Sequence, residues 1–252
     1  MNVILNTQSL QSDLTGIGRY TQNLLQGLRI HNIINQVVCI PNFKDCNNKI
    51  AKKNYFLSQF IKNIKCFPGT YSLFSDYKNM IFIKKTRFLI QDKYIYHEPC
   101  YILNSYSGPK VCTIHDLSHI HYPEYHPRER VKHLRYNLPI SINNADHIIT
   151  GSDFIRSEII NFFSIPPNKI TRIYHGISKA FKVRDFFEIK ITLRRYNLHN
   201  KSYLLYVGTL EPRKNLESLI QAFKQLPDQL RKNYPLVLVG MKGWKTARLE
   251  KL

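Results

Sequence analysis

Two adjacent cations, Arg213 and Lys214, stand in the segment of this chain whose residue types are best suited to binding a diphosphate. Before them, residues 203–207 form a short apolar run typical of a buried strand, and a glycine follows it. After them, apolar residues recur at helical spacing over residues 216–223. Cations at the positive end of a helix are unfavourable unless an anion lies between them, so the pattern predicts phosphate binding. Two solvated surface charges are the alternative.

Other polar or glycine residues follow other apolar runs. Gly16 and Gly18 come after the first run, where they would let the backbone approach a ligand, although a plain loop-to-helix turn would use them equally well. Ser152 is most simply a helix N-cap, with a phosphate or acceptor contact as the second interpretation. Gly176 would permit a turn into a cleft between domains.

His115 and Asp116 follow a further apolar run and are candidates for contact with a phosphate or a sugar, with Asp116 orienting the histidine or capping the next turn. A histidine at a strand end can donate a hydrogen bond to a phosphate or a sugar hydroxyl. A buried structural histidine beside a capping aspartate is the alternative. A metal site would add His119 and His121, but the spacing of these four residues does not fit one face of a helix or of a strand, so no metal is expected.

The elements that must position these residues are strands that alternate with helices, which predicts a doubly wound parallel sheet. Helices are expected where apolar residues recur at helical spacing over 17–28 and 154–162. The predicted strands of the first sheet are residues 3–5, 37–40, 94–96, 111–114, 147–150 and 170–174.

The domain boundary is expected where this pattern loosens. We predict a first domain over residues 1–182, a linker over 183–200 and the start of a second domain over 201–252. That second part offers strands at 203–207 and 236–239 and a helix at about 215–230. Two strands and one helix leave open sheet edges, so we expect a truncated domain that is not stable alone.

The composition places the chain among globular proteins with anionic partners. Its 37 Lys plus Arg exceed its 17 Asp plus Glu, a net charge of +20. Five cysteines without a CxxC pair argue against a disulfide framework. No signal peptide or membrane-spanning run is recognisable, so we expect a cytoplasmic protein.

Taken together, the motifs of this chain resemble those of the retaining glycosyltransferases of the GT-B fold, family 4. The resemblance covers nearly the whole chain. Residues 208–215, Gly-Thr-Leu-Glu-Pro-Arg-Lys-Asn, are similar to those of the branch that adds mannose or a related sugar to bacterial surface polysaccharides, including lipopolysaccharide. The motifs are Gly16-Ile-Gly18, Thr-Ile-His115-Asp116, Ala145-Asp-His-Ile-Ile-Thr-Gly-Ser152, Pro166-Pro-Asn-Lys-Ile170 before Tyr174-His-Gly176, and Val207-Gly-Thr-Leu-Glu-Pro-Arg213-Lys214-Asn.

The resemblance implies two Rossmann-like domains, the first on the acceptor side and the second binding a nucleotide sugar. The donor would be GDP-mannose as the first candidate, the acceptor a glycan or a lipid-linked glycan, and no cofactor would be needed. Arg213 and Lys214 match the cationic motif that holds the donor diphosphate, Gly16 and Gly18 match the loop near it, and His115 matches the histidine beside the transferred sugar. Retention of configuration would follow from cation-assisted departure of the leaving group.

The sequence departs from the family pattern in two ways. Thr209 stands where many members have arginine. The pair of glutamates seven residues apart that would hold the donor sugar does not occur, which indicates a truncated donor domain and impaired activity.

A basic, aromatic segment between Lys44 and Lys93 is a candidate for contact with an anionic membrane. The rival functions are a non-catalytic remnant that binds sugar nucleotides or other anions, a nucleic-acid-binding protein and, third, a metal hydrolase. No nucleic-acid-binding module is recognisable, so nucleic acid is not the expected partner.

Overall fold

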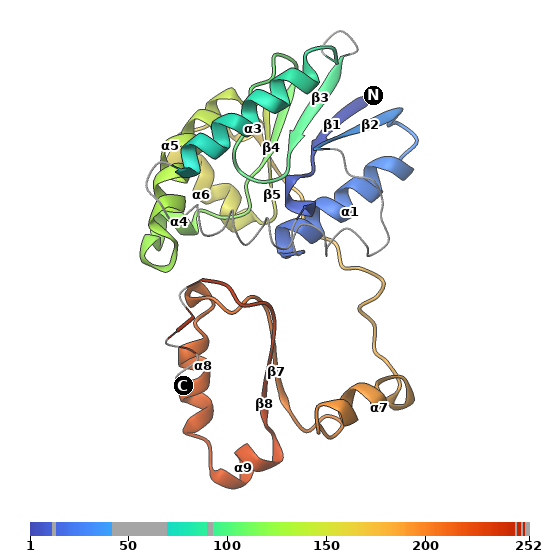
Figure 1. Cartoon of the computed structure of the whole chain (residues 1–252), viewed down its shortest axis with the longest axis vertical. Helices are drawn as coiled ribbons and strands as arrows, with labels where there is room; N and C mark the ends of the chain where they lie inside the picture. The colour runs from blue at the N-terminus through green and yellow to red at the C-terminus, as the bar shows by residue number, and fades with distance from the viewer. Residues whose placement is uncertain (12–13, 42–69, 90–92, 245, 248, 250–252) are drawn as a thin grey trace. The chain divides into compact units, whose positions relative to one another are not determined.

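A computed structural model of the chain describes residues 1–11, 14–41, 70–89, 93–244, 246–247 and 249 (Figure 1). It divides into two compact units, residues 1–175 and 176–252. The sequence placed the end of the first domain at residue 182 and a linker over 183–200. Each unit is described by itself below.

The first unit contains six parallel strands hydrogen-bonded in the order β2-β1-β3-β4-β5-β6. The chain winds one way from β1 to β2 and the other way from β3 onward, so the order reverses between β1 and β3. The predicted doubly wound parallel sheet is thus confirmed, with all six predicted strands present. The strands are β1 (Asn2–Asn6), β2 (Gln36–Ile40), β3 (Tyr94–Glu98), β4 (Lys110–Thr113), β5 (His147–Thr150) and β6 (Ile170–Arg172).

Helices lie in every connection between consecutive strands except that from β3 to β4, and two of these helices were predicted. The expected helices over 17–28 and 154–162 are confirmed as α1 (Gly16–Ile30) and α6 (Asp153–Phe163). The sequence analysis did not identify α3 (Thr70–Thr86), α4 (Ser118–His121) or α5 (Arg128–Asn144). Short 3-10 turns are formed by η1 (Gln8–Leu10), η2 (Pro123–Tyr125) and η3 (Pro167–Lys169).

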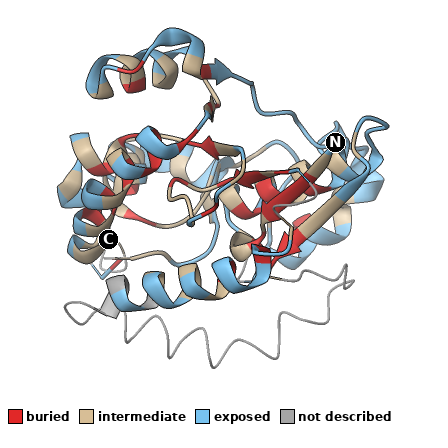
Figure 2. Ribbon diagram, turned by 90° about the horizontal axis from the view of Figure 1, so that it is seen from above, coloured by how far each residue is buried: buried red, intermediate tan, exposed pale blue. Residues whose placement is uncertain are grey.

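Side-chain alternation along the strands assigns the helices to opposite faces of the sheet. In β1, Ile4 packs in a cluster with Phe82 of α3, whereas the next residue, Leu5, packs with Leu25 of α1. A third cluster joins α5 and α6 to β4, β5 and β6. Buried residues accordingly gather along the strands of the sheet, in red in Figure 2.

The second unit holds two parallel strands, β7 (Leu204–Val207) and β8 (Leu236–Val239), as predicted. Between them lie η4 (Pro212–Lys214), α8 (Leu216–Lys224) and α9 (Asp228–Asn233). The prediction of one continuous helix over 215–230 was wrong, because Pro227 interrupts the helical hydrogen bonding and starts a new helix.

A further helix, α7 (Phe186–Arg195), lies within the predicted linker. Its start is fixed by a capping box in which the Asp185 and Glu188 side chains each bond the other's backbone N–H. The prediction overlooked this Asp-x-x-Glu signal.

The described helices include none that combines the length and the apolar character needed to cross a bilayer.

Candidate functional site

A cluster of polar side chains lies at the carboxyl end of β4, around the hydroxyl group of Thr113. His97 Nε2 lies 2.8 Å from Thr113 Oγ1, and the Tyr20 hydroxyl of α1 approaches the same oxygen to 3.2 Å. Burial lowers the pKa of His97 to about 4, so its imidazole is neutral at neutral pH. This cluster fixes α1 against the strand end with hydrogen bonds between uncharged groups.

His115 follows β4 by two residues and lies beside this cluster. Its Nε2–H donates to the Pro99 carbonyl oxygen at 2.8 Å, because a carbonyl oxygen can only accept. Its ring stands edge-on to Tyr20 at a centroid distance of 5.0 Å and lies 5.9 Å from the ring of His175. Burial lowers the pKa of His115. The ring is therefore a neutral imidazole whose Nδ1 can accept a hydrogen bond from a hydroxyl group.

Among the described residues, no group of three or more His, Cys, Asp or Glu side chains is placed so that it could hold a metal ion. Asp116 Oδ1 instead accepts hydrogen bonds from the Ser118 N–H at 3.0 Å and from its hydroxyl at 2.7 Å, so the capping role considered for it is present. His121 pairs with Glu158 at 2.8 Å, and His119 is buried near Tyr101.

Gly16 and Gly18 lie in the first turn of α1 rather than in a loop before it. A Cβ on Gly16 would meet no atom within 4 Å, so this position faces open space. A Cβ on Gly18 would lie 3.1 Å from the Ser9 carbonyl oxygen and from Leu14. Gly18 thus allows close packing of the preceding turn, whereas Gly16 leaves the backbone accessible at the helix start.

Ser152 caps α6, since its hydroxyl oxygen accepts a hydrogen bond from the Ile155 N–H at 3.2 Å. The N-cap interpretation of this residue is therefore present in the structure. The preceding residue, Gly151, allows His175 to approach, because a Cβ there would lie 2.6 Å from His175 Nε2. Tyr20, His115 and His175 thereby come together beside the start of α6, with Tyr20 and His175 rings 5.2 Å apart.

A second polar cluster lies on the opposite face of the sheet, at the end of β3. Glu98, only 3% exposed, follows His97, so the two side chains point to opposite faces. Its Oε2 accepts hydrogen bonds from Asn6 Nδ2 at 2.5 Å and from the Tyr96 hydroxyl at 2.6 Å, and its Oε1 accepts one from the Cys100 N–H at 3.1 Å. Burial raises the pKa of Glu98 to about 7, although these three hydrogen bonds oppose the rise.

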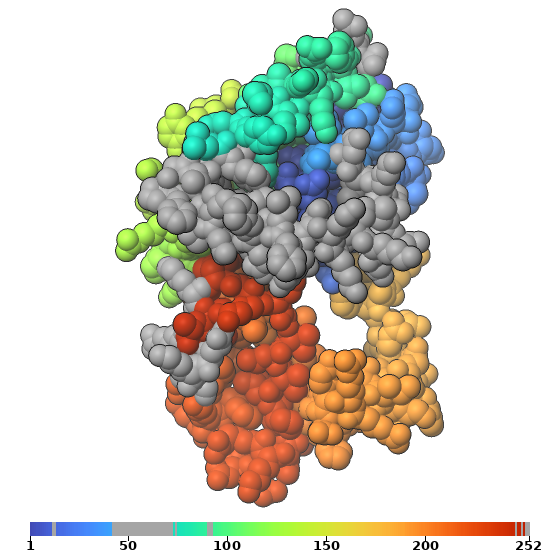
Figure 3. Space-filling model, in the orientation of Figure 1, coloured from blue at the N-terminus to red at the C-terminus, as the bar shows by residue number. Residues whose placement is uncertain are grey.

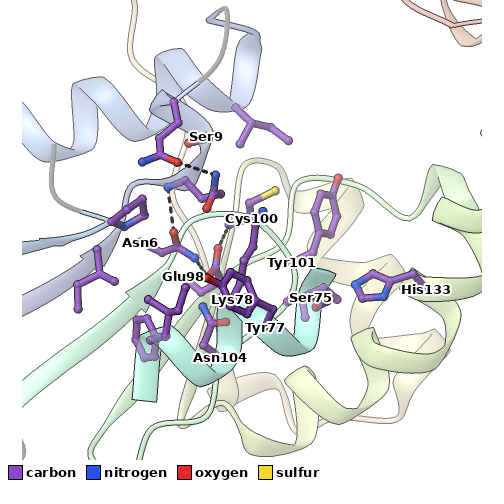
Figure 4. Close-up of a pocket in the computed structure, with 18 of the residues that line it drawn as sticks. Asn6, Ser9, Ser75, Tyr77, Lys78, Glu98, Cys100, Tyr101, Asn104 and His133 are labelled. Carbon is purple, nitrogen blue, oxygen red and sulfur yellow. Dashed lines mark hydrogen bonds between the residues drawn. The ribbon is translucent and has the colours of Figure 1, made fainter. Parts of the chain in front are cut away.

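A cavity of about 640 Å³ opens over this cluster, at the point where the strand order reverses (Figure 4). Ligands of open α/β sheets bind at this position. Three cations line it, Lys78 and Lys85 from α3 and Arg130 from α5, whereas Glu98 is the one acid among the described lining residues. The cavity therefore combines hydroxyl-binding groups at the strand ends with positive charge contributed by two helices.

Glu98 and Asn6 were not among the site residues predicted from the sequence. Each is the last residue of a strand that was predicted correctly, so the rule that ligands bind beyond strand ends would have selected both. Their contact with each other depends on the parallel pairing of β1 with β3.

In the second unit, the predicted cations lie just before α8. Arg213 and Lys214 belong to the 3-10 turn η4, and Asn215, with a left-handed φ of 53°, joins that turn to the helix. One terminal N–H of Arg213 donates to Glu211 Oε1 at 2.7 Å, and Glu211 is 5% exposed. Arg213 Nε is buried without a hydrogen-bond partner among the residues that the structure describes. Lys214 is exposed. The turn therefore holds one cation that is anchored by a hydrogen bond, Arg213, and one that is exposed, Lys214.

Glycines bring the backbones after β7 and β8 together near this turn. A Cβ on Gly240 would lie 1.7 Å from the Gly208 carbonyl oxygen, and one on Gly243 would lie 2.7 Å from that of Leu210. Gly176 is the first residue of this unit, and a Cβ there would meet nothing within 4 Å.

Comparison with known proteins assigns both parts of the chain to glycosyltransferase models. The model of glycosyltransferase family 4 matches residues 14–181, and that of glycosyl transferases group 1 matches residues 190–252.

Curated relatives carry related names. The chain is 33% identical over 249 residues to O-antigen chain mannosyltransferase B of Escherichia coli, covering 97% of this chain and 65% of that protein. It is 30% identical over 131 residues to the serotype-specific mannosyltransferase WbdA of Escherichia coli, covering 51% of this chain and 16% of that protein. An uncharacterized glycosyltransferase of Methanocaldococcus jannaschii is 31% identical over 104 residues, 40% of this chain and 26% of that protein. The chain thus spans just under two thirds of the first relative.

Proposed function

The chain belongs to glycosyltransferase family 4, and from this premise we propose that it transfers a mannose-like hexose from a nucleotide sugar to a glycan. The observation that carries the proposal is the identity of 33% to an O-antigen chain mannosyltransferase along 97% of the chain. GDP-mannose is the proposed donor, and a polysaccharide or a lipid-linked glycan is the proposed acceptor. We also propose that transfer retains the anomeric configuration.

Arg213 and Lys214 are the groups proposed to hold the donor diphosphate. Glu211 fixes the Arg213 guanidinium at 2.7 Å, and the Arg213 side chain keeps 31% of its surface exposed, where a ligand could reach it. Positive groups that are held in place before the reaction stabilise negative charge as it develops on the leaving diphosphate. This would favour departure of the nucleotide without a protein nucleophile.

His115 is proposed to accept a hydrogen bond from a hydroxyl of the transferred sugar. Its Nε2–H is engaged by the Pro99 carbonyl, and its lowered pKa keeps the ring neutral. A neutral ring next to Tyr20 provides an acceptor without placing a positive charge near the anomeric carbon. Gly16, at the open start of α1, would allow close approach of the ligand.

The cavity over Glu98 is proposed to receive the acceptor. Carboxylate and amide groups at the ends of β1 and β3 suit sugar hydroxyls, and the cations of α3 and α5 suit a phosphorylated carrier. A carrier lipid would place the protein at the cytoplasmic face of a membrane, as a peripheral protein.

The proposal predicts donor-dependent transfer by the 252-residue chain. Labelled mannose from GDP-mannose should appear in lipid-linked glycan, and Arg213→Ala should lower the rate by about 10²–10³-fold, the usual effect of removing one charge-stabilising donor. Calorimetry with GDP-mannose should show a parallel loss of binding. Lys224→Ala, which removes an exposed cation at the other end of α8, is the matched control and should leave both unchanged.

Because Arg213→Ala also leaves the buried Glu211 without its partner, Arg213→Lys is needed as a second variant. It keeps the charge and should retain part of the binding. Binding of GDP-mannose without transfer would favour the non-catalytic alternative, and failure of the wild-type chain to bind any nucleotide sugar would overturn the proposal.

A further inference from the structure

The outward face of α3 is more apolar than the stability of the fold requires. Leu73, Tyr77, Met80 and Ile83 are 70%, 56%, 59% and 44% exposed. The first three recur at intervals of four and three residues, so they form one stripe along the helix. Large apolar side chains that gather in this way on a surface mark a contact with a membrane or with another protein.

The opposite face of the same helix already provides its packing against the sheet. Phe82 and Thr86 are buried, and the Phe82 ring lies 4.5 Å from the ring of Tyr96 in β3. The Thr86 hydroxyl also bonds back to the Phe82 carbonyl at 3.0 Å. The exposed stripe therefore contributes little to holding α3 in place, and its apolar character needs another explanation.

Positive charge continues the stripe toward the end of the helix. Lys84 and Arg87 are exposed on the same side as Met80, and the Arg87 guanidinium lies 4.3 Å from the centre of the Phe88 ring, which is 68% exposed. The helix contains one acid, Asp76. In Figure 3 the side chains of α3, in teal, form part of the visible surface.

We propose that this surface of Leu73, Tyr77, Met80, Lys84, Arg87 and Phe88, here named the α3 surface, docks on an anionic lipid bilayer. Apolar and aromatic side chains of an interfacial helix enter the boundary between headgroups and acyl chains, and cations beside them pair with anionic headgroups. The mixture of exposed apolar groups and positive charge fits a bilayer better than an uncharged protein partner.

The position of α3 links this surface to the cavity described above. The other edge of the helix supplies Ser75, Lys78 and Lys85 to the cavity lining, and Tyr77 of the α3 surface also lines the cavity (Figure 4). A docked α3 would therefore hold that cavity beside the lipid headgroups, where the headgroup of a lipid-linked acceptor lies. This membrane contact rests on the proposed function only for its biological purpose, which is access to a lipid-linked acceptor. Docking itself needs no sugar donor.

Flotation of the whole chain with vesicles tests the proposal in the absence of nucleotide sugar. We expect the protein to float with vesicles of phosphatidylglycerol and phosphatidylcholine, and to bind pure phosphatidylcholine vesicles much more weakly. Each cation near the surface contributes about fivefold to the partition coefficient, so Lys84→Gln with Arg87→Gln should lower it by roughly 25-fold. Leu73→Ser with Met80→Ser should also lower it, and circular dichroism should be unchanged because both side chains are exposed.

Two matched controls separate the α3 surface from the general charge of the chain. Lys224→Gln with Lys232→Gln removes the same charge from exposed positions of the second unit, and Ile30→Ser removes an apolar group that is 86% exposed on α1. Both should float as the wild type does.

Equal losses in the controls and in the α3 variants would overturn the proposal, and so would α3 variants that float like the wild type. Sedimentation gives a further check: a wild-type dimer that Leu73→Ser with Met80→Ser converts to monomer would identify the surface as a contact between copies instead. Loss of sugar transfer with intact flotation would count against the proposed function alone.

Discussion

The two parallel sheets of this chain differ in how their strands are covered. In the first unit, Ile4, Cys112 and Ile148 are fully buried between helices, whereas in the second unit Leu205 is 54% exposed and Val207 71% exposed. Similar apolar sequences therefore occupy different environments. Strand residues of the second sheet are thus more apolar than their packing within this unit requires. The same kind of substitution should therefore change the stability of the two units by different amounts.

A similar contrast holds for two buried glutamates, Glu98 at the end of β3 and Glu211 directly before η4. Glu98 is satisfied by neutral donors from its own strand, a neighbouring strand and the following loop. Glu211 is paired with a guanidinium two residues away. The hydrogen bonds of Glu98 join two strands of a sheet, whereas the pair of Glu211 and Arg213 lies within a single turn. One site is thus built by tertiary structure and the other by local structure.

The largest expected difference between the units is in core truncation. Leu138→Ala removes a fully buried side chain from the main cluster of the first unit and should lower the free energy of unfolding by about 2–5 kcal/mol. Leu205→Ala, in the exposed strand, should cost less than about 1 kcal/mol. Urea unfolding followed by circular dichroism measures both. Equal costs would show that β7 is covered in solution and would break the comparison.

Gly240→Ala should destabilise the second unit, because the backbones at Gly208 and Gly240 lie very close together. The new Cβ would meet the Gly208 carbonyl oxygen at 1.7 Å, so the backbones must separate, at a cost of about 1–3 kcal/mol. Hydrogen exchange should become faster in residues 204–210 and 236–243, with no change in β4. Unchanged exchange in those residues would mean that the two backbones have room to move apart.

The ionisation of Glu98 should produce a pH-dependent effect in the first unit. The pKa of Glu98 is raised from 4.5 to about 7, so the unfolded chain loses this proton at lower pH than the folded chain does. Its contribution to stability is therefore complete below pH 4.5 and lost as the pH rises to about 7. The Glu98→Gln variant cannot ionise there, so its free energy of unfolding minus that of the wild type should increase between pH 4.5 and 7 and then level off.

Urea unfolding of both proteins from pH 4.5 to 8 provides this difference. His97, whose pKa is lowered to about 4, destabilises the folded state as the pH falls below 6.5, but it does so in both proteins and cancels in the difference. A difference that does not change with pH would mean that the three hydrogen bonds to the carboxylate fully offset its burial.

The smallest effect is expected at Gly16. A methyl group there meets nothing within 4 Å, and alanine favours a helix, so Gly16→Ala should stabilise the first unit by about 0.5–1 kcal/mol. A thermal melt measures this gain. If transfer activity falls while stability rises, Gly16 is needed for ligand approach, and if activity is unchanged the glycine is only a helix start.

The sequence predicted the strands well because β strands of a buried parallel sheet are short apolar runs, as in Val37 to Ile40. It predicted α1 and α6 from one-sided apolar spacing, and it identified the caps at Ser152 and Asp116 as alternatives to ligand binding. It did not predict α3, because apolar residues lie on both sides of that helix and hide its period. The Lys44 to Lys93 segment proposed to meet membranes falls partly outside the described residues, and α3 is its described part.

The Glu98 cluster could not be assembled from the sequence, since its donors are residues 6, 96 and 100 and only the pairing of β1 with β3 brings Asn6 to Glu98. The strand, the turn with Arg213 and the start of the following helix were predictable because these parts are consecutive in the sequence.

The close approach of Gly208 to Gly240 has a mechanical consequence. Leu210 N–H donates to the Met241 carbonyl at 2.9 Å, and Gly243 N–H donates to the Leu210 carbonyl at 2.9 Å, so hydrogen bonds link the segments after β7 and β8. A shift of the loop that leads to Arg213 would therefore break these hydrogen bonds or carry residues 241–243 with it. A molecule that displaces residues 241–243 should therefore also displace the Arg213 guanidinium. A ligand that binds the guanidinium should in turn change the position of Lys242.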